Sequence, residues 1–186
     1  MNQTFNYYLI TDPKYYTNDK NIFKEKLEDI LTNKRVDMAC FRDKESSNYE
    51  ELANIFINTC KRFNIKQIIL NENLDLAIKL NCGIHLTSKQ FDKIKIAKEA
   101  NLYTIISCHN EEDIKKAIQE KAEAITYSPI FPTPNKGEPK GVKVLENIQK
   151  KYNIKIIALG GIINDLQIKQ IQDCQVHGFA SIRYFV

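Results

Sequence analysis

The sequence predicts an α/β protein built as a (β/α)8 TIM barrel, in a single domain that spans residues 1–186. Short apolar runs alternate with amphipathic stretches along the whole chain, and strict alternation of strands and helices is typical of a parallel sheet. Polar residues also follow most of the apolar runs, and the carboxyl ends of the strands are where such barrels carry their active groups. An open doubly wound sheet has the same repeat and is the alternative.

The candidate strands are the short apolar runs, of which there are eight. They lie at residues 8–11, 36–41, 67–71, 83–86, 103–107, 124–130, 154–159 and 178–185. Between them, stretches such as 22–31 and 49–60 carry apolar residues at i, i+3 and i+4, which predicts amphipathic helices.

The end of the sequence departs from the repeat. Val186 follows the eighth run directly, so the final outer helix is expected to be missing. This would leave an apolar seam between the first and seventh helices, and apolar stripes of that size are uncommon on monomers. We therefore expect a neighbouring subunit or a shifted helix to cover the seam, and a homodimer or other homo-oligomer.

Composition excludes several classes of protein. A chain of 186 residues with 43% hydrophobic residues can bury one full core. Its 27 basic and 23 acidic residues are interspersed, so the net charge of +4 predicts a solvated surface and no nucleic-acid partner. Five cysteines without a C-x-x-C pair argue against a disulfide framework or a zinc ribbon. With no leader-like start and no run near the roughly 18 apolar residues of a membrane span, we expect a cytoplasmic protein without membrane contact.

One segment combines a buried run with a proline-rich loop. Residues 124–141 read A-I-T-Y-S-P-I-F-P-T-P-N-K-G-E-P-K-G and contain four of the five prolines of the chain, together with Lys136. Proline fixes φ and removes a backbone donor, so this loop is poor material for a core. We interpret it as an active-site loop that holds the Lys136 ammonium over the barrel mouth.

A second junction carries paired glycines. Residues 154–162 read I-K-I-I-A-L-G-G-I and are followed by Asn164 and Asp165, which are candidate caps of the next helix. Gly160 and Gly161 would let backbone amides approach a phosphate. The alternative is a tight strand-to-helix turn without a ligand.

The other strand ends carry polar residues as well. They are Asp12, Arg42, Lys44, Asn71, Glu72, His85, Ser88, Ser107, His109, Ser128, Ser181 and Arg183. Their convergence at one rim predicts a site, although His85 taken singly could also satisfy only a neighbouring carbonyl. Cys108 should face the opposite side of its strand from Ser107 and pack. His177 precedes the last strand, at the rim that usually serves stability.

Six ordered motifs carry a family resemblance. They are C-F-R-D-K (40–44), I-L-N-E (69–72), G-I-H-L-T-S-K-Q (83–90), I-S-C-H (106–109), F-P-T-P-N-K (131–136) and A-L-G-G-I (158–162). They resemble Q-L-R-x-K, I-N-D, G-V-H-L-G-Q-x-D, V-S-x-H, F-x-T-x-x-K and A-I-G-G-I of the thiamine phosphate synthase and TenI-type thiazole tautomerase superfamily, whose members are (β/α)8 barrels. The resemblance covers nearly the whole chain.

Some positions depart from the synthase pattern. Glu72 and Gln90 stand where the synthase holds magnesium with two aspartates, and a neutral amide is a weaker ligand for a hard cation. Cys40 stands where a glutamine helps to seat the pyrimidine, and it cannot make the same paired hydrogen bonds. Arg183 falls near the family's last-strand serine and could hold a phosphate bidentately.

These departures favour a metal-independent thiazole tautomerase that acts on a thiazole carboxylate phosphate and requires no cofactor. The resemblance then implies that His109 is the general acid and base. It implies that Arg42, Lys44 or Lys136 holds the carboxylate. The remaining expected contacts with the phosphorylated substrate come from Asn71, Ser107, Thr133, Gly160, Gly161 and Arg183.

Two alternatives remain open. The first is a thiamine phosphate synthase that joins thiazole phosphate and aminopyrimidine diphosphate with Mg²⁺, for which Glu72 is the candidate metal ligand and Arg42, Lys44 and Lys136 are the cations beside the diphosphate. The second is a non-catalytic barrel that binds a thiazole or thiamine phosphate.

Overall fold

Eight parallel strands close into a barrel in the order β1 to β8 in the computed structural model, which describes residues 4–186. The strands are β1 (Asn6–Ile10), β2 (Met38–Phe41), β3 (Gln67–Asn71), β4 (Gly83–Leu86), β5 (Thr104–Cys108), β6 (Ala124–Tyr127), β7 (Lys155–Leu159) and β8 (Gly178–Ser181). Strand β1 pairs with both β2 and β8, which closes the ring. The predicted barrel is therefore confirmed, and the open sheet is excluded.

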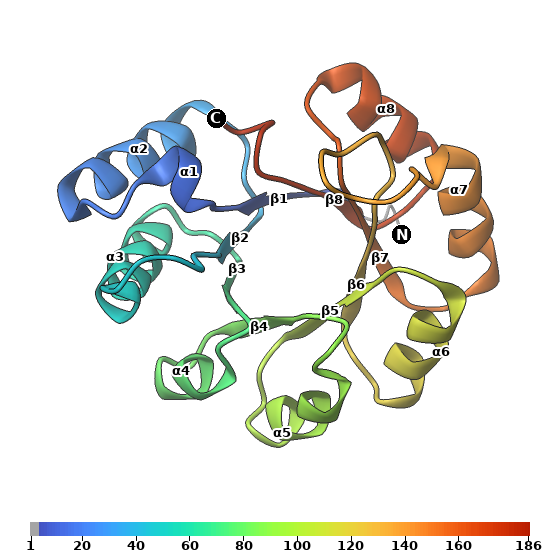
Figure 1. Ribbon diagram of the computed structural model, residues 1–186, viewed down its shortest axis with the longest axis horizontal. Coiled ribbons are helices and arrows are strands. Elements are labelled where there is room, and N and C mark those ends of the chain that lie inside the picture. The colour runs from blue at the N-terminus through green and yellow to red at the C-terminus, as the bar shows by residue number, and fades with distance from the viewer. Residues whose placement is uncertain (1–3) are drawn as a thin grey trace.

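The helices form the outer ring around these strands (Figure 1). They are α1 (Pro13–Tyr16), α2 (Lys20–Asn33), α3 (Tyr49–Arg62), α4 (Leu74–Lys79), the 3₁₀ turn η1 (Phe91–Lys93), α5 (Ile94–Glu99), α6 (Glu111–Gln119), α7 (Gly141–Lys151) and α8 (Asp165–Asp173). Asp or Asn side chains cap α2, α4, α6 and α8 by accepting hydrogen bonds from first-turn amides, which satisfies donors that a helix start leaves free. Asn164 is the cap of α8, as predicted.

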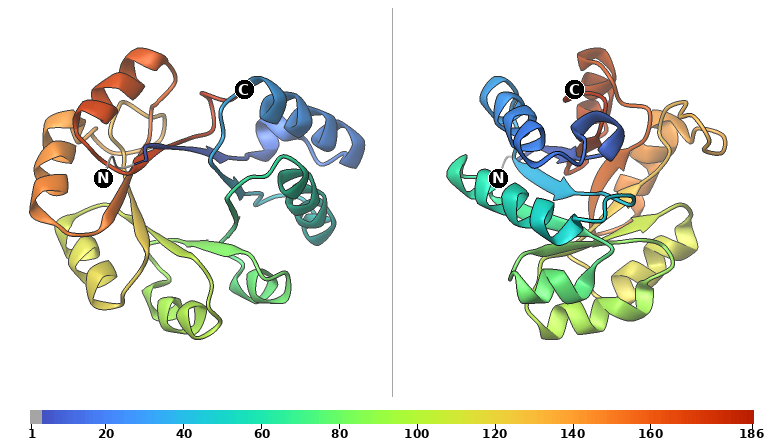
Figure 2. Two further views of the ribbon diagram at one scale, coloured as in Figure 1. Left: turned by 180° about the vertical axis from the view of Figure 1, so that it is seen from behind. Right: turned by 60° about the vertical axis from the view of Figure 1, so that its left-hand side comes forward.

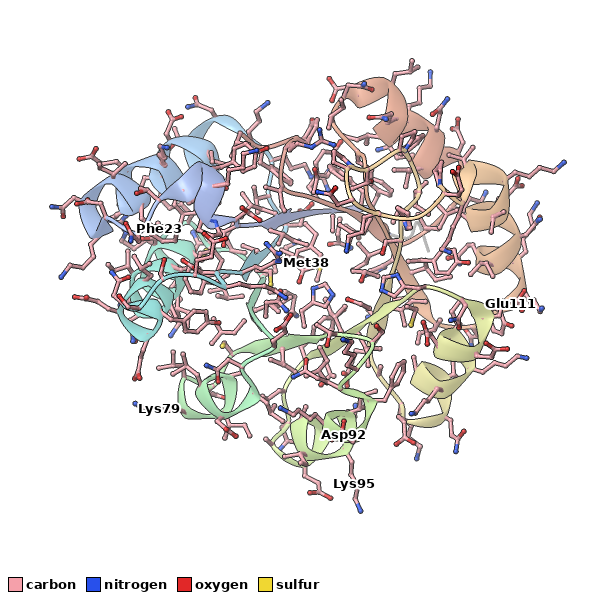
Figure 3. The ribbon with its side chains drawn as sticks, viewed as in Figure 1. Phe23, Met38, Lys79, Asp92, Lys95 and Glu111 are labelled. Carbon is pink, nitrogen blue, oxygen red and sulfur yellow. The ribbon has the colours of Figure 1, made fainter. Side chains whose placement is uncertain are left out.

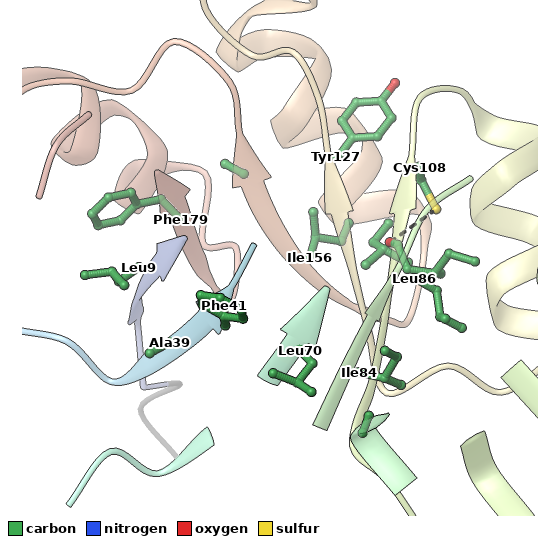
Figure 4. Close-up of a cluster of buried hydrophobic side chains, with 14 of the residues drawn as sticks. Leu9, Ala39, Phe41, Leu70, Ile84, Leu86, Cys108, Tyr127, Ile156 and Phe179 are labelled. Atoms are coloured by element: carbon green, nitrogen blue, oxygen red, sulfur yellow. Dashed lines mark hydrogen bonds between the residues drawn. The ribbon is translucent and has the colours of Figure 1, made fainter. Parts of the chain in front are cut away.

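The core has two layers because successive strand residues point to opposite faces. In β1, Tyr8 belongs to the cluster inside the barrel, whereas Leu9 packs in the cluster between strands and helices. Met38 is likewise an interior residue, while Lys79 and Glu111 lie on the outer helices (Figure 3). Figure 4 shows part of the layer between strands and helices.

The end of the chain differs from the sequence prediction. The eighth strand was expected to reach residue 185, but β8 ends at Ser181. The chain turns there because the Tyr184 amide donates to Ser181 Oγ (3.2 Å) and the Phe185 amide donates to the Ile182 carbonyl (3.3 Å). Within residues 4–186 no helix follows β8, as expected.

Aromatic side chains of the chain itself fill much of the expected seam between α2 and α8. Phe179, Tyr184 and Phe185 pack against one another and against Tyr7, with ring centroids 4.9–6.3 Å apart. The Tyr184 hydroxyl donates to Asp165 (2.8 Å) at the start of α8. The final segment runs between α8 and α2 in Figure 1. A shifted helix is therefore not what covers the seam, and the homo-oligomer stays a prediction.

Other strand bounds moved by a few residues. The sixth run was predicted at 124–130, but β6 ends at Tyr127. The Ile130 and Phe131 amides still donate to the Leu159 and Gly160 carbonyls (3.0 Å each), so the proline-rich loop begins as a continuation alongside β7. Among the described residues no helix has the length and apolar character needed to cross a membrane. Residues 1–3, part of the start expected to lack a leader, lie outside the described residues, and the cytoplasmic location stays a prediction.

Candidate active site

The predicted site residues converge at the carboxyl ends of the strands, where they form two groups. The paired corner consists of Arg42, Lys44, Asn71, Glu72 and Gln90 after β2, β3 and β4. The open corner consists of His109, Ser128, Thr133, Gly160, Gly161 and Arg183, which follow β5 to β8. Each group has its own electrostatic character.

Arg42 of the paired corner is held in place by Thr11 and Asp12, which follow the neighbouring strand β1. Its guanidinium donates to Asp12 at 2.5 Å. Its backbone amide donates to the Thr11 hydroxyl (2.8 Å), and that hydroxyl lies 3.1 Å from the Arg42 carbonyl. The Arg42 side chain is 30% exposed, so it can still meet a ligand at the mouth.

Lys44 and Glu72 form the second ion pair of this corner, with Nζ and Oε1 2.6 Å apart. Gln90 lies beside them, and both its side-chain oxygen and its side-chain nitrogen form local hydrogen bonds. Its Oε1 accepts from the Thr87 amide (3.1 Å) and hydroxyl (3.2 Å), and its Nε2 donates to the Glu72 carbonyl (3.1 Å). The amide oxygen that would replace the family's second aspartate is thus already used.

The paired corner is where the synthase alternative would place a magnesium ion. No group of three His, Cys, Asp or Glu side chains among residues 4–186 is arranged to hold a metal. Magnesium in phosphate chemistry is commonly held by one or two carboxylates together with the phosphates of the substrate. Glu72 supplies one carboxylate, so the residues fit an ion that binds together with a diphosphate, and they do not fit an ion held by protein ligands alone.

A buried polar network crosses the barrel interior beneath both corners. His85 Nδ1 lies 3.1 Å from the Tyr8 hydroxyl, and Nε2 lies 3.2 Å from both Ser107 Oγ and Thr126 Oγ1. Burial, with a smaller effect from the Arg42 charge, lowers the pKa of His85 to about 4, so its imidazole is neutral near pH 7. The Asn71 side chain donates to the His85 carbonyl (3.1 Å), which joins the paired corner to this network.

His109 in the open corner has a defined proton arrangement. Its Nδ1 lies 3.2 Å from the Ser128 carbonyl oxygen and 3.3 Å from the Ser128 hydroxyl. A carbonyl oxygen only accepts hydrogen bonds, so a proton on Nδ1 makes this contact a hydrogen bond and leaves the lone pair on Nε2. The His109 backbone amide donates to Asp113 (2.8 Å), and the side chain is exposed at the rim. Its Nε2 can therefore act as a base.

The two glycines allow the proline-rich loop to lie close to the end of β7. Gly161 has φ +70°, and a Cβ there would lie 2.6 Å from the Pro132 carbonyl oxygen. A Cβ on Gly160, with φ +99°, would lie 2.8 Å from Pro129 Cα. Both positions therefore require glycine. Gln167 of α8 fixes this turn, because its Nε2 donates to the Gly161 carbonyl (3.0 Å).

A cleft of about 600 Å³ opens at this turn, and we name it the phosphate cleft for the ligand expected from the sequence. It is lined by Pro132, Thr133, Pro134, Gly161, Ile163, Gln167 and Arg183. Three residues predicted to contact the phosphate, Thr133, Gly161 and Arg183, therefore line one cavity. The loop 128–140, which contributes Pro132, Thr133 and Pro134 to this lining, projects from the barrel (Figure 2).

The remaining candidates are placed more simply. Lys136 lies exposed on the proline-rich loop, where its amide donates to the Thr133 carbonyl (3.2 Å). Cys108 packs in the layer outside the barrel, and burial raises the pKa of its thiol, as a packing role predicts (Figure 4). His177 precedes β8 at the opposite rim, near the Asn6 side chain (3.1 Å). The tyrosines beside the first strand were expected to pack, and Tyr8 and Tyr16 are indeed buried.

Sequence reasoning missed the contacts that join strands. It did not assign a role to Thr126 or Gln167, and it paired neither Tyr8 with His85 nor His109 with Ser128. Strict alternation along β4, β5 and β6 could have placed His85, Ser107 and Thr126 on the inner face, since each is two residues from another inward position. Nothing in the sequence could have placed Gln167 against Gly161.

Comparison with known proteins adds to this geometry. A family model described as thiamine monophosphate synthase matches residues 7–185. The chain belongs to the thiamine monophosphate synthase family. The resemblance inferred from the six motifs is thereby confirmed, and membership places the chain among enzymes of thiamine biosynthesis.

Several relatives extend the comparison. The chain is 34% identical to a putative thiamine-phosphate synthase 2 of Aquifex aeolicus, covering 96% of each chain. It is 33% identical to a thiamine-phosphate synthase of Prochlorococcus marinus over 95% of this chain but only 49% of that protein, so it spans about half the length of that relative. The fold matches a thiamine phosphate pyrophosphorylase from Pyrococcus furiosus with a TM-score of 0.82 and 21% identity, covering 97% of this chain and 87% of the other.

Proposed function

We propose that this protein binds a thiazole phosphate in the phosphate cleft and joins it to an aminopyrimidine diphosphate, as a thiamine phosphate synthase. The observation that carries the proposal is the similarity to the Aquifex aeolicus protein, which covers 96% of both chains and has the joining reaction in its name. The preference for a tautomerase, drawn from the sequence, gives way to this reaction. The tautomerase is kept below as a second candidate.

The phosphate would be held at the open corner. Gly161 lets the backbone lie close to a ligand, and Arg183 contributes a guanidinium to the lining of the same cleft. Thr133 adds a hydroxyl, although in the structure that hydroxyl donates to the Phe131 carbonyl (2.9 Å). These groups would fix the thiazole so that its ring points toward the barrel axis.

The diphosphate would lie over the paired corner. Joining forms a bond between the thiazole nitrogen and the pyrimidine methylene carbon and breaks the bond from that carbon to the diphosphate oxygen. Arg42 and Lys44 would stabilise the departing anion, with Lys136 reaching in from the loop. Magnesium bound with the diphosphate through Glu72 would supply further neutralising charge.

A thiazole tautomerase is the second candidate, and Gln90 is the observation that favours it. The family's second metal-binding carboxylate is replaced by an amide whose oxygen already accepts two hydrogen bonds from Thr87 and whose nitrogen donates to Glu72. A tautomerase needs no metal, because it only removes a proton from one position of the thiazole and returns it at another. His109, with a free Nε2, would move that proton.

Two parallel assays separate the candidates. The purified protein is given thiazole phosphate, aminopyrimidine diphosphate and magnesium, and separately thiazole carboxylate phosphate without metal. Formation of thiamine phosphate supports the synthase, whereas tautomer conversion alone replaces it with the tautomerase. Silence in both assays, with thiazole phosphate still bound, would overturn both in favour of a non-catalytic binding barrel.

The His109→Asn variant sharpens the result. A tautomerase should lose roughly 10²- to 10⁴-fold in kcat while still binding the phosphate. His177→Asn, at the opposite rim, is the matched control and should keep its rate. An unchanged rate in His109→Asn would remove this histidine from the mechanism.

A further inference from the structure

The hydrogen bonds of the buried network inside the barrel run in one direction, from donor to acceptor, and the proposed reaction does not account for it. Tyr8 is fully buried, His85 is 5% exposed and Thr126 is fully buried, whereas Ser107 is half-buried near the carboxyl end of β5. Ser107 is thus the member of the network that can meet a ligand. The direction of each hydrogen bond can be worked out from the donors and acceptors present.

Tyr8 fixes the first bond. Burial raises its pKa well above the usual value, so the phenol keeps its proton and must donate it somewhere. Among residues 4–186, the nitrogen or oxygen atom within hydrogen-bond distance of this hydroxyl is His85 Nδ1, at 3.1 Å; the other neighbour is the weakly accepting sulfur of Cys40. Nδ1 therefore accepts, and the single proton of the neutral imidazole is on Nε2.

The Ser107 oxygen accepts hydrogen bonds from the other members of the network. The Nε2 proton points to Thr126 Oγ1 and Ser107 Oγ, both 3.2 Å away, and the Thr126 hydroxyl donates to Ser107 Oγ (3.4 Å). With its oxygen accepting from below, the hydroxyl proton of Ser107 is directed away from the network. On the inner face near the end of β5, this direction is the barrel mouth.

We propose that Tyr8 and His85 are positioning residues that fix Ser107 as a hydrogen-bond donor toward the bound ligand. The site would then favour a ligand that presents an acceptor, a heteroaromatic nitrogen or an anionic oxygen, above Ser107. The identity of that ligand as a thiazole phosphate rests on the proposed function. The hydrogen-bond direction within the network does not.

The tautomer of His85 tests the network without any ligand. In ¹⁵N-labelled protein, long-range ¹H–¹⁵N correlations should show the Nε2–H form for His85 and the Nδ1–H form for His109, which serves as an internal reference. Tyr8→Phe should abolish the single tautomer of His85. Tyr16→Phe is the matched control, because the Tyr16 hydroxyl is buried without a hydrogen-bond partner in the described part of the chain. A Nδ1–H form of His85 in the unaltered protein would overturn the proposal.

Ligand affinity tests the consequence. Ser107→Ala should weaken thiazole phosphate binding by about tenfold, the effect of one lost hydrogen bond. His85→Leu should weaken it by a similar factor, and the double variant should lose no more than either single variant, because both act through one bond. Inorganic phosphate, which occupies only the phosphate cleft, should bind all three equally. Losses that multiply in the double variant would contradict the coupling.

A conservative variant guards against misfolding. His85→Gln places an amide donor where Nε2 lies, so it should recover affinity for thiazole phosphate even if His85→Leu does not fold. A fully folded His85→Gln that binds as weakly as Ser107→Ala would overturn the positioning role. If the unaltered protein binds thiazole phosphate no better than inorganic phosphate, the proposed function fails, and the tautomer measurement still decides the network.

Discussion

The two corners of the barrel mouth differ in how they could hold an anion. In the paired corner the cations already have carboxylate partners: Arg42 is bonded to Asp12 and Lys44 to Glu72. In the open corner the turn at Gly161 and the Arg183 side chain line an accessible cleft. An anion at the open corner meets a cleft lining that, within the described part of the chain, contains no carboxylate, whereas an anion at the paired corner must compete with carboxylates.

This difference separates two kinds of recognition. A site built around a glycine turn has its backbone fixed by the fold and can receive a phosphate with little rearrangement. At a site made of ion pairs, an anionic ligand binds only if its contacts with the cations offset the ion pairs that it breaks. Exposed ion pairs contribute about 0–1 kcal/mol each. We therefore expect thiazole phosphate to dock at the open corner and the second substrate to reorganise the paired corner.

The largest expected effect concerns stability and comes from His85, in the buried polar network beneath the two corners. The pKa of His85 is about 4 in the folded protein and about 6.5 when exposed, so between these values the unfolded chain binds a proton that the folded chain does not. The free energy of unfolding should fall by about 3 kcal/mol as pH drops from about 6.5 to 4. Urea denaturation across this range measures it. His85→Gln should lose this share of the pH dependence, and an unchanged slope would contradict the assignment.

The glycine turn of the open corner should be the next most sensitive. Gly161→Ala should cost at least about 2 kcal/mol of stability, because φ is +70° and the added methyl meets the Pro132 carbonyl oxygen. Phosphate affinity should fall with it. Gly137→Ala is the control, in the neighbouring proline-rich loop against which Gly161 packs, since nothing lies within 4 Å of a Cβ there, and it should change stability by less than about 0.5 kcal/mol. Equal effects in thermal denaturation would refute the close approach.

The paired corner can be altered at Gln90. Gln90→Asp should restore a second carboxylate beside Glu72 and tighten Mg²⁺ binding in the absence of diphosphate by about tenfold. Gln90→Asn shortens the side chain equally without adding charge and should show no gain. Calorimetric titration with Mg²⁺ alone, and then with inorganic diphosphate, distinguishes the two. Tight Mg²⁺ binding by the unaltered protein in the absence of diphosphate would contradict the conclusion that the protein ligands alone do not hold the ion.

The smallest effect is expected at the exposed wall of the open corner. Arg183→Ala should weaken the binding of inorganic phosphate by about fivefold, since an exposed charged hydrogen bond is worth about 1 kcal/mol. Arg62→Ala, which removes an arginine paired with Glu28 on the outside of the barrel, is the control and should leave this Kd unchanged. Equal Kd values for both variants would place the phosphate elsewhere.

Much of this architecture could be predicted from the sequence because it depends on local pattern. The alternation of short apolar runs with amphipathic stretches gave the strand order, and β3 and β4 coincide with the predicted ranges. Asn164 was recognisable as a cap from its position before α8. The rim residues followed from the rule that parallel strands present their carboxyl ends at one side.

The predicted end of the eighth strand was wrong because contacts with other segments decide where that strand ends. β8 stops at Ser181 because the chain turns back on that side chain, and the expected seam is filled by aromatic residues from both ends of the chain. Neither follows from the apolar content of residues 178–185, which continues past the turn.

The sequence by itself determined which residues reach the mouth, since side-chain alternation and strand direction are local properties. Only the tertiary structure decided their states: Lys44 paired with Glu72, Gln90 engaged by Thr87, His85 neutral between Tyr8 and Ser107. These states depend on distances between side chains 3 to 77 positions apart in the chain. Hydrogen bonds and ion pairs act over about 3 Å, so the contacts of Lys44 with Glu72 and of Tyr8 with His85 form only when the fold brings different strands together, whereas the contact of Gln90 with Thr87 forms within one turn.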